Sequence, residues 1–229
     1  MSILEIKNLY KTCKSKENNK ELIVLNKINQ TFEKGKIYNI IGHSGAGKTT
    51  LLRIIGLLTE YDSGKILLNN IDSLNMNDKE KALIRNKNIG FVFQNYLLND
   101  SLKSIENIMV PMYINKDIKP RNRKKIAREL LKKVNLQNKE NNFPKEMSGG
   151  EQQRIAIARA LANNPEIILA DEPTGNLDKK NEKNILEIFL RLKDEGKCII
   201  IASHSDYVRE YSDVVLKIDN GKLEVLKWD

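Results

Sequence analysis

The sequence has few of the features that characterise secreted or membrane-spanning proteins. It contains two cysteines, Cys13 and Cys198, which lie far apart and lack the spacing of a metal site. Near the start, Glu5 stands where a signal peptide would need an apolar segment, so we expect a chain of the reducing cytoplasm. No apolar run approaches the roughly 20 residues of a membrane-spanning helix. Any membrane role is therefore expected to come through a partner.

Internal repeats, low-complexity blocks and lipidation motifs are absent as well. The 229 residues fit one large domain, or one domain with an inserted lobe. The formal net charge is +9, and the densest basic run spans residues 119–133. Such a run is typical of a surface that contacts an anionic membrane or a nucleic acid, and equally of a solvated helix face. The polar stretch at residues 14–20 is expected to be a loop.

Apolar patterning predicts an α/β fold. Strands of an N-terminal sheet are expected where apolar residues alternate or cluster between polar turns, at residues 4–10, 22–32 and 65–72. Short continuous apolar runs, typical of parallel strands that helices cover on both faces, occur at residues 89–93, 166–171 and 198–203.

Helical patterning dominates residues 101–161. Within it Ile126, Leu130, Leu131 and Val134 share one face, while lysine and arginine occupy the other. The pattern predicts a helical lobe, at about residues 95–160, inserted into an α/β core. All of residues 1–229 are expected to form this one domain.

The segment GHSGAGKTT follows an expected strand, precedes an expected helix, and fits the G-x-x-x-x-G-K-[ST] pattern of a phosphate-binding loop. Its glycines let backbone N–H groups approach phosphates, and the helix N-terminus adds a favourable dipole. Lys48 is expected to meet the β- and γ-phosphates, and Thr49 to ligate Mg²⁺. The candidate nucleotide contacts are Gly42, His43, Ser44, Gly45, Ala46, Gly47, Lys48, Thr49 and Thr50.

The run IILADE supplies two carboxylates at the end of an apolar strand. Asp171 is expected to hold the Mg²⁺ shell, and Glu172 to orient a water or accept its proton. Carboxylates at a strand end can also be ordinary turn residues, but a phosphate loop in the same chain favours the catalytic interpretation.

A second glycine-rich turn, MSGGEQQR, opens another expected helix about a hundred residues after the phosphate loop. Ser148 offers a hydroxyl, Gly149 and Gly150 offer open N–H groups, and the helix from about Glu151 points its positive end at an anion. One loop already surrounds the phosphates from one side. The second turn is therefore expected to close over a nucleotide bound to another copy, although alone it would be an ordinary helix start.

The order of these motifs resembles the ATP-binding subunit of an ABC transporter over essentially the whole chain. The resemblance rests on the phosphate loop, Gln94 after IGFVF, MSGGEQQR, IILADEP, GNLD at residues 175–178, and His204 in ASHS. It implies a P-loop NTPase core with a parallel sheet, an N-terminal antiparallel β subdomain and an inserted helical lobe. ATP and Mg²⁺ are the implied cofactors.

The resemblance also implies roles for single residues. Gln94 would touch the Mg²⁺ or the attacking water and report to a membrane partner, and Asp178 would couple the two sites of a dimer. His204 would contact the γ-phosphate, which places it with Glu172, Gln94 and Lys48 among the catalytic candidates. Tyr10 falls where the family has an aromatic side chain that stacks on adenine. Met147 replaces the more usual leucine, a swap of similar size.

The implied protein is a homodimer in its ATP state, bound at the cytoplasmic face of the membrane through an integral permease subunit. That permease is expected to dock near Gln94 to Leu98, where Tyr96, Leu97 and Leu98 either receive a partner helix or pack the lobe. The wording DEPTGNLD looks most like the subgroup of macrolide exporters, lipoprotein-release ATPases and antimicrobial-peptide resistance transporters. A soluble ABC ATPase acting on nucleic acid or the ribosome is the alternative; the chain lacks the coiled-coil insertion or second ATPase unit of such proteins, so no direct nucleic-acid contact is expected.

Overall fold

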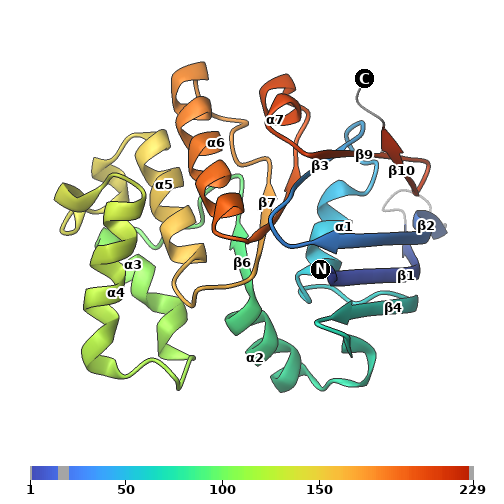
Figure 1. Ribbon diagram of the computed structural model, residues 1–229, viewed down its shortest axis with the longest axis horizontal. Coiled ribbons are helices and arrows are strands. Elements are labelled where there is room, and N and C mark those ends of the chain that lie inside the picture. The colour runs from blue at the N-terminus through green and yellow to red at the C-terminus, as the bar shows by residue number, and fades with distance from the viewer. Residues whose placement is uncertain (1, 15–20, 227–229) are drawn as a thin grey trace.

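A computed structural model describes residues 2–14 and 21–226. It contains two sheets, with helices packed beside and between them (Figure 1). The loop expected at residues 14–20 is wrong at Lys14, which is the last residue of strand β1, and residues 15–20 lie outside the described residues.

The strands are β1 (Ser2–Lys14), β2 (Glu21–Glu33), β3 (Ile37–Ile41), β4 (Ser63–Leu68), β5 (Ile71–Asp72), β6 (Ile89–Val92), β7 (Ile167–Asp171), β8 (Cys198–Ala202), β9 (Val214–Asp219) and β10 (Lys222–Leu226). The α-helices are α1 (Lys48–Ile55), α2 (Asp78–Asn88), α3 (Ser104–Met109), α4 (Pro120–Lys133), α5 (Gly149–Ala160), α6 (Lys179–Asp194) and α7 (Asp206–Glu210). Short 3₁₀ turns are η1 (Ser73–Asn75), η2 (Val110–Tyr113), η3 (Gln137–Lys139) and η4 (Pro144–Glu146).

The N-terminal sheet is antiparallel, with the strand order β2-β1-β4-β5. The prediction of a single strand at residues 65–72 was wrong, because two strands joined by a tight turn, β4 and β5, form there. Asn69 and Asn70 both have positive φ, 49° and 63°. Asparagine tolerates this conformation, and two such residues turn the chain back into a hairpin.

The second sheet has the order β10-β9-β3-β8-β7-β6. Strands β9, β3, β8, β7 and β6 are parallel to one another, which confirms the predicted parallel core. The edge hairpin of β9 and β10 was not predicted. Its signal was present in the sequence, since Asn220 and Gly221 form the Asn-Gly pair that favours a two-residue hairpin turn.

Alternate residues of the parallel strands enter two different cores. In β7, Ile167 and Leu169 pack with α1 and the antiparallel sheet, while Ile168 and Ala170 pack with α5 and α6. All four side chains are fully buried. Burial on both faces explains why these strands are continuous apolar runs.

The chain between β6 and β7 is helical, with α3 and α4 on one side of the molecule (Figure 1). The face predicted for α4 is correct, because Leu131 and Val134 are buried and Ile126 and Leu130 pack against the same core. Helix α5 begins at Gly149, two residues before the predicted start. The division of residues 1–229 into a core and a lobe at about 95–160 stays a prediction.

Candidate nucleotide site

The phosphate loop joins β3 to α1, as its pattern requires. Gly47 caps the helix with a left-handed φ of 106°, and the Leu51 N–H donates to its carbonyl at 2.8 Å. A Cβ at Gly47 would lie 3.0 Å from the carbonyl oxygen of Val24 in β2, so both conformation and space favour glycine. Because α1 starts at Lys48, its first N–H groups point back at the loop, where they can bind an anion.

The Lys48 ammonium group lies across the loop. Its Nζ donates to the carbonyl oxygens of Gly42 at 2.7 Å and His43 at 3.2 Å. Within the described chain Lys48 forms no salt bridge. Its positive charge is therefore not neutralised by a protein carboxylate and remains available to phosphate oxygens.

Thr49 and Asp171 meet although 122 positions separate them. Thr49 Oγ1 donates to Asp171 Oδ1 at 3.1 Å, which joins the start of α1 to the end of β7. Burial raises the pKa of Asp171, while the Thr49 hydrogen bond and the charge of Lys48 act in the opposite direction. A half-buried carboxylate of this kind is stabilised as an anion by a bound cation.

Glu172 stands next to Asp171 with a positive φ of 45°, a rare conformation for a residue other than glycine. Its N–H donates to the Ala202 carbonyl at 2.8 Å, which fixes it to the end of β8. His204 Nδ1 lies 3.0 Å from Glu172 Oε1. Glu172 Oε2 is buried without a hydrogen-bond partner in the described chain. One carboxylate oxygen is thus held by His204, and the other has no hydrogen-bond partner within the described chain.

These groups line a single open pocket. All nine residues of the loop contribute, together with Val24, Gln94, Asp171, Glu172 and His204. Sequence reasoning missed Val24, because only the fold brings β2 to the loop. The half-buried Tyr10 of β1 does not belong to the described lining of this pocket, so its stacking on adenine stays a prediction.

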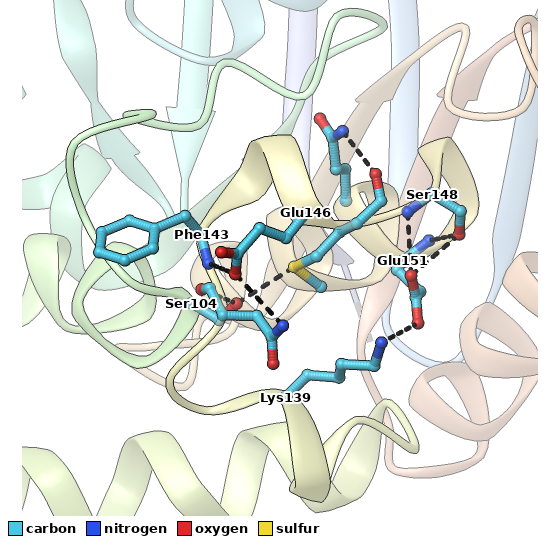
Figure 2. A network of polar contacts seen from close by, with 9 residues as sticks. Ser104, Lys139, Phe143, Glu146, Ser148 and Glu151 are labelled. Carbon is cyan, nitrogen blue, oxygen red and sulfur yellow. Dashed lines mark hydrogen bonds and ion pairs between the residues drawn. The ribbon is translucent and has the colours of Figure 1, made fainter.

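Ser148, Gly149 and Gly150, here called the signature turn, lie outside the described lining of the pocket. Ser148 caps α5 in a reciprocal arrangement with Glu151 (Figure 2). Its N–H and Oγ donate to Glu151 Oε2 at 2.9 and 3.1 Å, and the Glu151 N–H donates to Ser148 Oγ at 3.3 Å. Lys139 Nζ pairs with Glu151 Oε1 at 3.1 Å.

The Glu151 carboxylate therefore accepts the hydrogen bonds that the N–H and Oγ of Ser148 donate. Burial raises the pKa of Glu151, but the hydrogen bonds from Ser148 and Lys139 outweigh it and leave the pKa lowered. In the segment before the turn, the Phe143 N–H donates to Glu146 Oε2 at 2.9 Å (Figure 2). Ser104 Oγ donates to Met147 Sδ at 3.2 Å. The turn is thus preformed by its own neighbours.

Asp178 is linked to the signature turn through Asn181. Its side chain accepts from Asn181 N at 2.9 Å and from Asn181 Nδ2 at 2.8 Å, and these hydrogen bonds lower its pKa. A Cβ at Gly150 would lie 2.5 Å from Asn181 Oδ1. Gly150 must be glycine for Asn181 to fit, a contact that sequence reasoning did not anticipate.

A separate apolar groove lies beside α2, the end of β6 and η2. We call it the docking groove; its lining includes Phe91, Phe93, Leu97, Pro111, Ile114, Arg85, Asn86, Arg159 and Asn163. Leu97 is 58% exposed and Ile114 56% exposed. Leu98, by contrast, packs against the buried core. Leu98 thus packs against the core, whereas the docking of a partner helix at the exposed Leu97 stays a prediction.

A phosphate loop, an aspartate near its threonine and a glutamate with a free carboxylate oxygen together define a P-loop nucleotide site built for phosphate hydrolysis. The family model of the ABC transporter matches residues 25–175. The chain therefore belongs to the ABC transporter family, and it is an ATP-binding subunit that hydrolyses ATP.

Individual relatives agree. An uncharacterized ABC transporter ATP-binding protein of Thermotoga maritima is 44% identical over 85% of this chain and 82% of its own. The lipoprotein-releasing system ATP-binding protein LolD of Aquifex aeolicus is 41% identical over 96% of both chains.

Solved structures match as well. The dimeric ABC transporter cassette MJ0796 has a TM-score of 0.88 and 36% identity, covering 99% of this chain and 100% of that cassette. A second structure of that cassette, a dimer in a post-hydrolysis state with ADP and Pi, also has a TM-score of 0.88. These matches do not favour the alternative of an ATPase acting on nucleic acid or the ribosome. Across residues 2–14 and 21–226, each helix is too short or too polar to cross a membrane.

Proposed function

We propose that two copies of this ATPase subunit close head to tail over two ATP molecules and thereby drive a membrane partner. One observation carries the proposal. The phosphate pocket is open, and the signature turn, where the N–H groups of Gly149 and Gly150 begin α5, lies outside the described lining of that pocket. A second copy would bring its signature turn to the open side of the pocket, as the dimeric form of the similar cassette supports.

The oxygen donors at the pocket fit Mg²⁺. Thr49 and Asp171 lie within hydrogen-bond distance, and Gln94 adds an amide to the same lining. Mg²⁺ prefers one or two protein oxygens together with phosphate oxygens and water, and it would neutralise charge on the transferred group. In the proposed roles Lys48 holds the β- and γ-phosphates, and Gln94 reports the state of the site.

Glu172 is proposed to act as the general base. Its free Oε2 would take a proton from water as the water oxygen bonds to the γ-phosphorus and the bond to the β–γ bridging oxygen breaks. His204 holds Oε1, which orients the carboxylate, and its exposed ring would contact the γ-phosphate. A positioned base of this kind contributes roughly 10² to 10⁴ in rate.

Hydrolysis would also reopen the pair. If loss of the γ-phosphate removes about two charge-assisted hydrogen bonds at each of two sites, the dimer loses on the order of 6–12 kcal/mol, at roughly 1.5–3 kcal/mol each. Moving a two-state equilibrium from 1:99 to 99:1 takes about 5.5 kcal/mol. ATP would therefore close the dimer, Asp178 near the turn would couple the two sites, and product formation would open it.

The docking groove is proposed to receive a cytoplasmic helix of an integral membrane permease. Its apolar lining and the exposure of Leu97 and Ile114 support this role. The protein would then lie at the cytoplasmic face of the membrane through that partner. The similarity to a lipoprotein-releasing ATPase supports an export or force-transmitting system as the context.

The groove can be tested by co-purification from the native cell. Tagged protein recovered from detergent-solubilised membranes is expected to carry an integral membrane protein in near-equal amount. Ile114→Glu, which puts a charge into the groove, is expected to reduce that recovery at least tenfold without affecting ATP hydrolysis by the isolated subunit. The matched control is Val225→Glu on β10, where the original side chain is 60% exposed.

Equal recovery with Ile114→Glu and Val225→Glu would show that the permease binds elsewhere. Ribosomes or nucleic acid that resist a salt wash, with no membrane protein, would overturn the membrane-coupled function.

A further inference from the structure

Residues 94–97, here called the coupling segment, connect three sites in one chain. Gln94 lines the phosphate pocket, and Leu97 lines the docking groove. Between them Tyr96 reaches the signature turn, because a Cβ built on Gly149 would lie 2.9 Å from Tyr96 Oη. Three consecutive peptide units therefore link the nucleotide, the proposed partner and the turn that faces the second copy.

Arg159 holds the coupling segment from α5, the helix that begins at the signature turn. Its Nη2 donates to the Tyr96 carbonyl at 2.7 Å, and its Nη1 donates to the Leu97 carbonyl. Burial lowers the pKa of Arg159, and within the described chain no carboxylate pairs with it. A partly buried cation loses hydration that hydrogen bonds must replace, so these two carbonyls are the partners that stabilise it.

The backbone of the coupling segment needs such support. Tyr96 and Leu97 have φ values of 58° and 49°, in the left-handed region that residues other than glycine rarely adopt. Conformations of this kind persist only where surrounding contacts hold them. Arg159 donates hydrogen bonds to the carbonyls of both residues, so its guanidinium holds this left-handed backbone in place.

We propose that Arg159 and Tyr96 are positioning residues that couple the docking groove to the signature turn within one chain. The proposal rests on the proposed function, in which the groove binds the permease and the turn contacts the ATP of a second copy. A partner that displaces Leu97 would also shift the adjacent Tyr96, whose hydroxyl already lies against Gly149. Through Arg159 it would also pull on α5, and so move the donors of Ser148.

Arginine suits this role better than lysine. Its planar guanidinium presents several N–H groups in a fixed fork and can hold two carbonyl oxygens at once, whereas an ammonium is a flexible point charge. Arg159→Lys keeps the positive charge but is expected to release at least one of the two carbonyls.

The first test measures the ATP-driven dimer of Glu172→Gln protein, in which hydrolysis is blocked. Adding Arg159→Lys is expected to weaken the dimer by about tenfold or more, the effect of one charge-assisted hydrogen bond. Binding of a fluorescent ATP analogue to the monomer is expected to change by less than about twofold, since Arg159 does not touch the phosphate pocket. The matched control is Arg128→Lys on α4, an exposed arginine paired with Glu140.

The second test uses nucleotide-free monomer and so does not depend on dimer formation. Gly149→Ala would place a methyl group against Tyr96 Oη and is expected to speed hydrogen exchange at the amides of Tyr96, Leu97 and Asn99, which donate hydrogen bonds in this structure. Adding Tyr96→Phe removes the clashing oxygen and is expected to restore most of the protection. A general loss of stability in Gly149→Ala, which would not depend on the Tyr96 hydroxyl, would not be reversed by Tyr96→Phe.

The outcomes distinguish a failure of the proposed dimer from a failure of the coupling role. A Glu172→Gln parent that stays monomeric with ATP would contradict the proposed dimer. A parent that dimerises while Arg159→Lys dimerises equally well would overturn the coupling role. Unchanged exchange at the coupling segment in Gly149→Ala would overturn it too. Weaker ATP binding together with general unfolding in Arg159→Lys would also overturn it, because it would mark Arg159 as a stability residue.

Discussion

Glu172→Gln is expected to lower kcat for ATP hydrolysis by about 10² to 10⁴-fold, the range for loss of a general base. Glutamine has nearly the same shape, and its amide oxygen can keep the contact with His204 Nδ1, which lies 3.0 Å away in the native protein. What it loses is the unpartnered Oε2 that can accept a proton. ATP affinity is therefore expected to stay within about twofold. Steady-state phosphate release and equilibrium nucleotide binding measure the two quantities.

The matched control for this variant is Glu187→Gln, which changes an exposed carboxylate on α6. It is expected to hydrolyse ATP at the native rate. If Glu172→Gln retained more than about a tenth of native kcat, the base would have to be another group, and the geometry at the end of β7 would need a different chemical interpretation.

Lys48→Ala is expected to weaken ATP binding by roughly 10² to 10⁴-fold. In the proposed complex the ammonium makes charge-assisted hydrogen bonds to two phosphates, each contributing roughly 1.5–3 kcal/mol. In the free protein it bonds only to the carbonyls of Gly42 and His43, so removing it costs the folded loop far less. Titration with a fluorescent ATP analogue gives the affinity, and thermal unfolding reports whether the fold is kept.

Lys183→Ala on α6 controls for the loss of one exposed positive charge and is expected to bind ATP normally. Lys48→Ala protein with near-native affinity would mean that the backbone N–H groups alone hold the phosphates. Weak binding accompanied by a large drop in unfolding temperature would mean that Lys48 acts mainly through the loop.

Motifs of fixed spacing could be read from the sequence because local geometry determines them. A strand, a glycine-rich turn and a helix place residues 42–50 in one way, and the carboxyl ends of parallel strands meet at one edge of a sheet. This is why Asp171 comes to lie beside Thr49. The buried apolar strands likewise showed in advance that helices cover both faces of the sheet.

Contacts between distant segments could not be read in the same way. Val24 enters the pocket because β2 crosses the phosphate loop, and no local pattern marks it. Asn181 beside Gly150 and Arg159 on the coupling segment depend on how α5 and α6 pack. Asn181 and Arg159 are polar side chains of a kind that is common on helix surfaces. Only the tertiary arrangement gives each of them its partner.

The most direct test of the central claim is the mass of Glu172→Gln protein in solution, measured by multi-angle light scattering with and without saturating ATP. The head-to-tail account predicts a monomer without nucleotide and a dimer with ATP. It also predicts that ADP does not support the dimer, and that Lys48→Ala added to this protein abolishes the ATP effect. A protein that binds ATP with native affinity and yet remains monomeric at saturation would contradict the account.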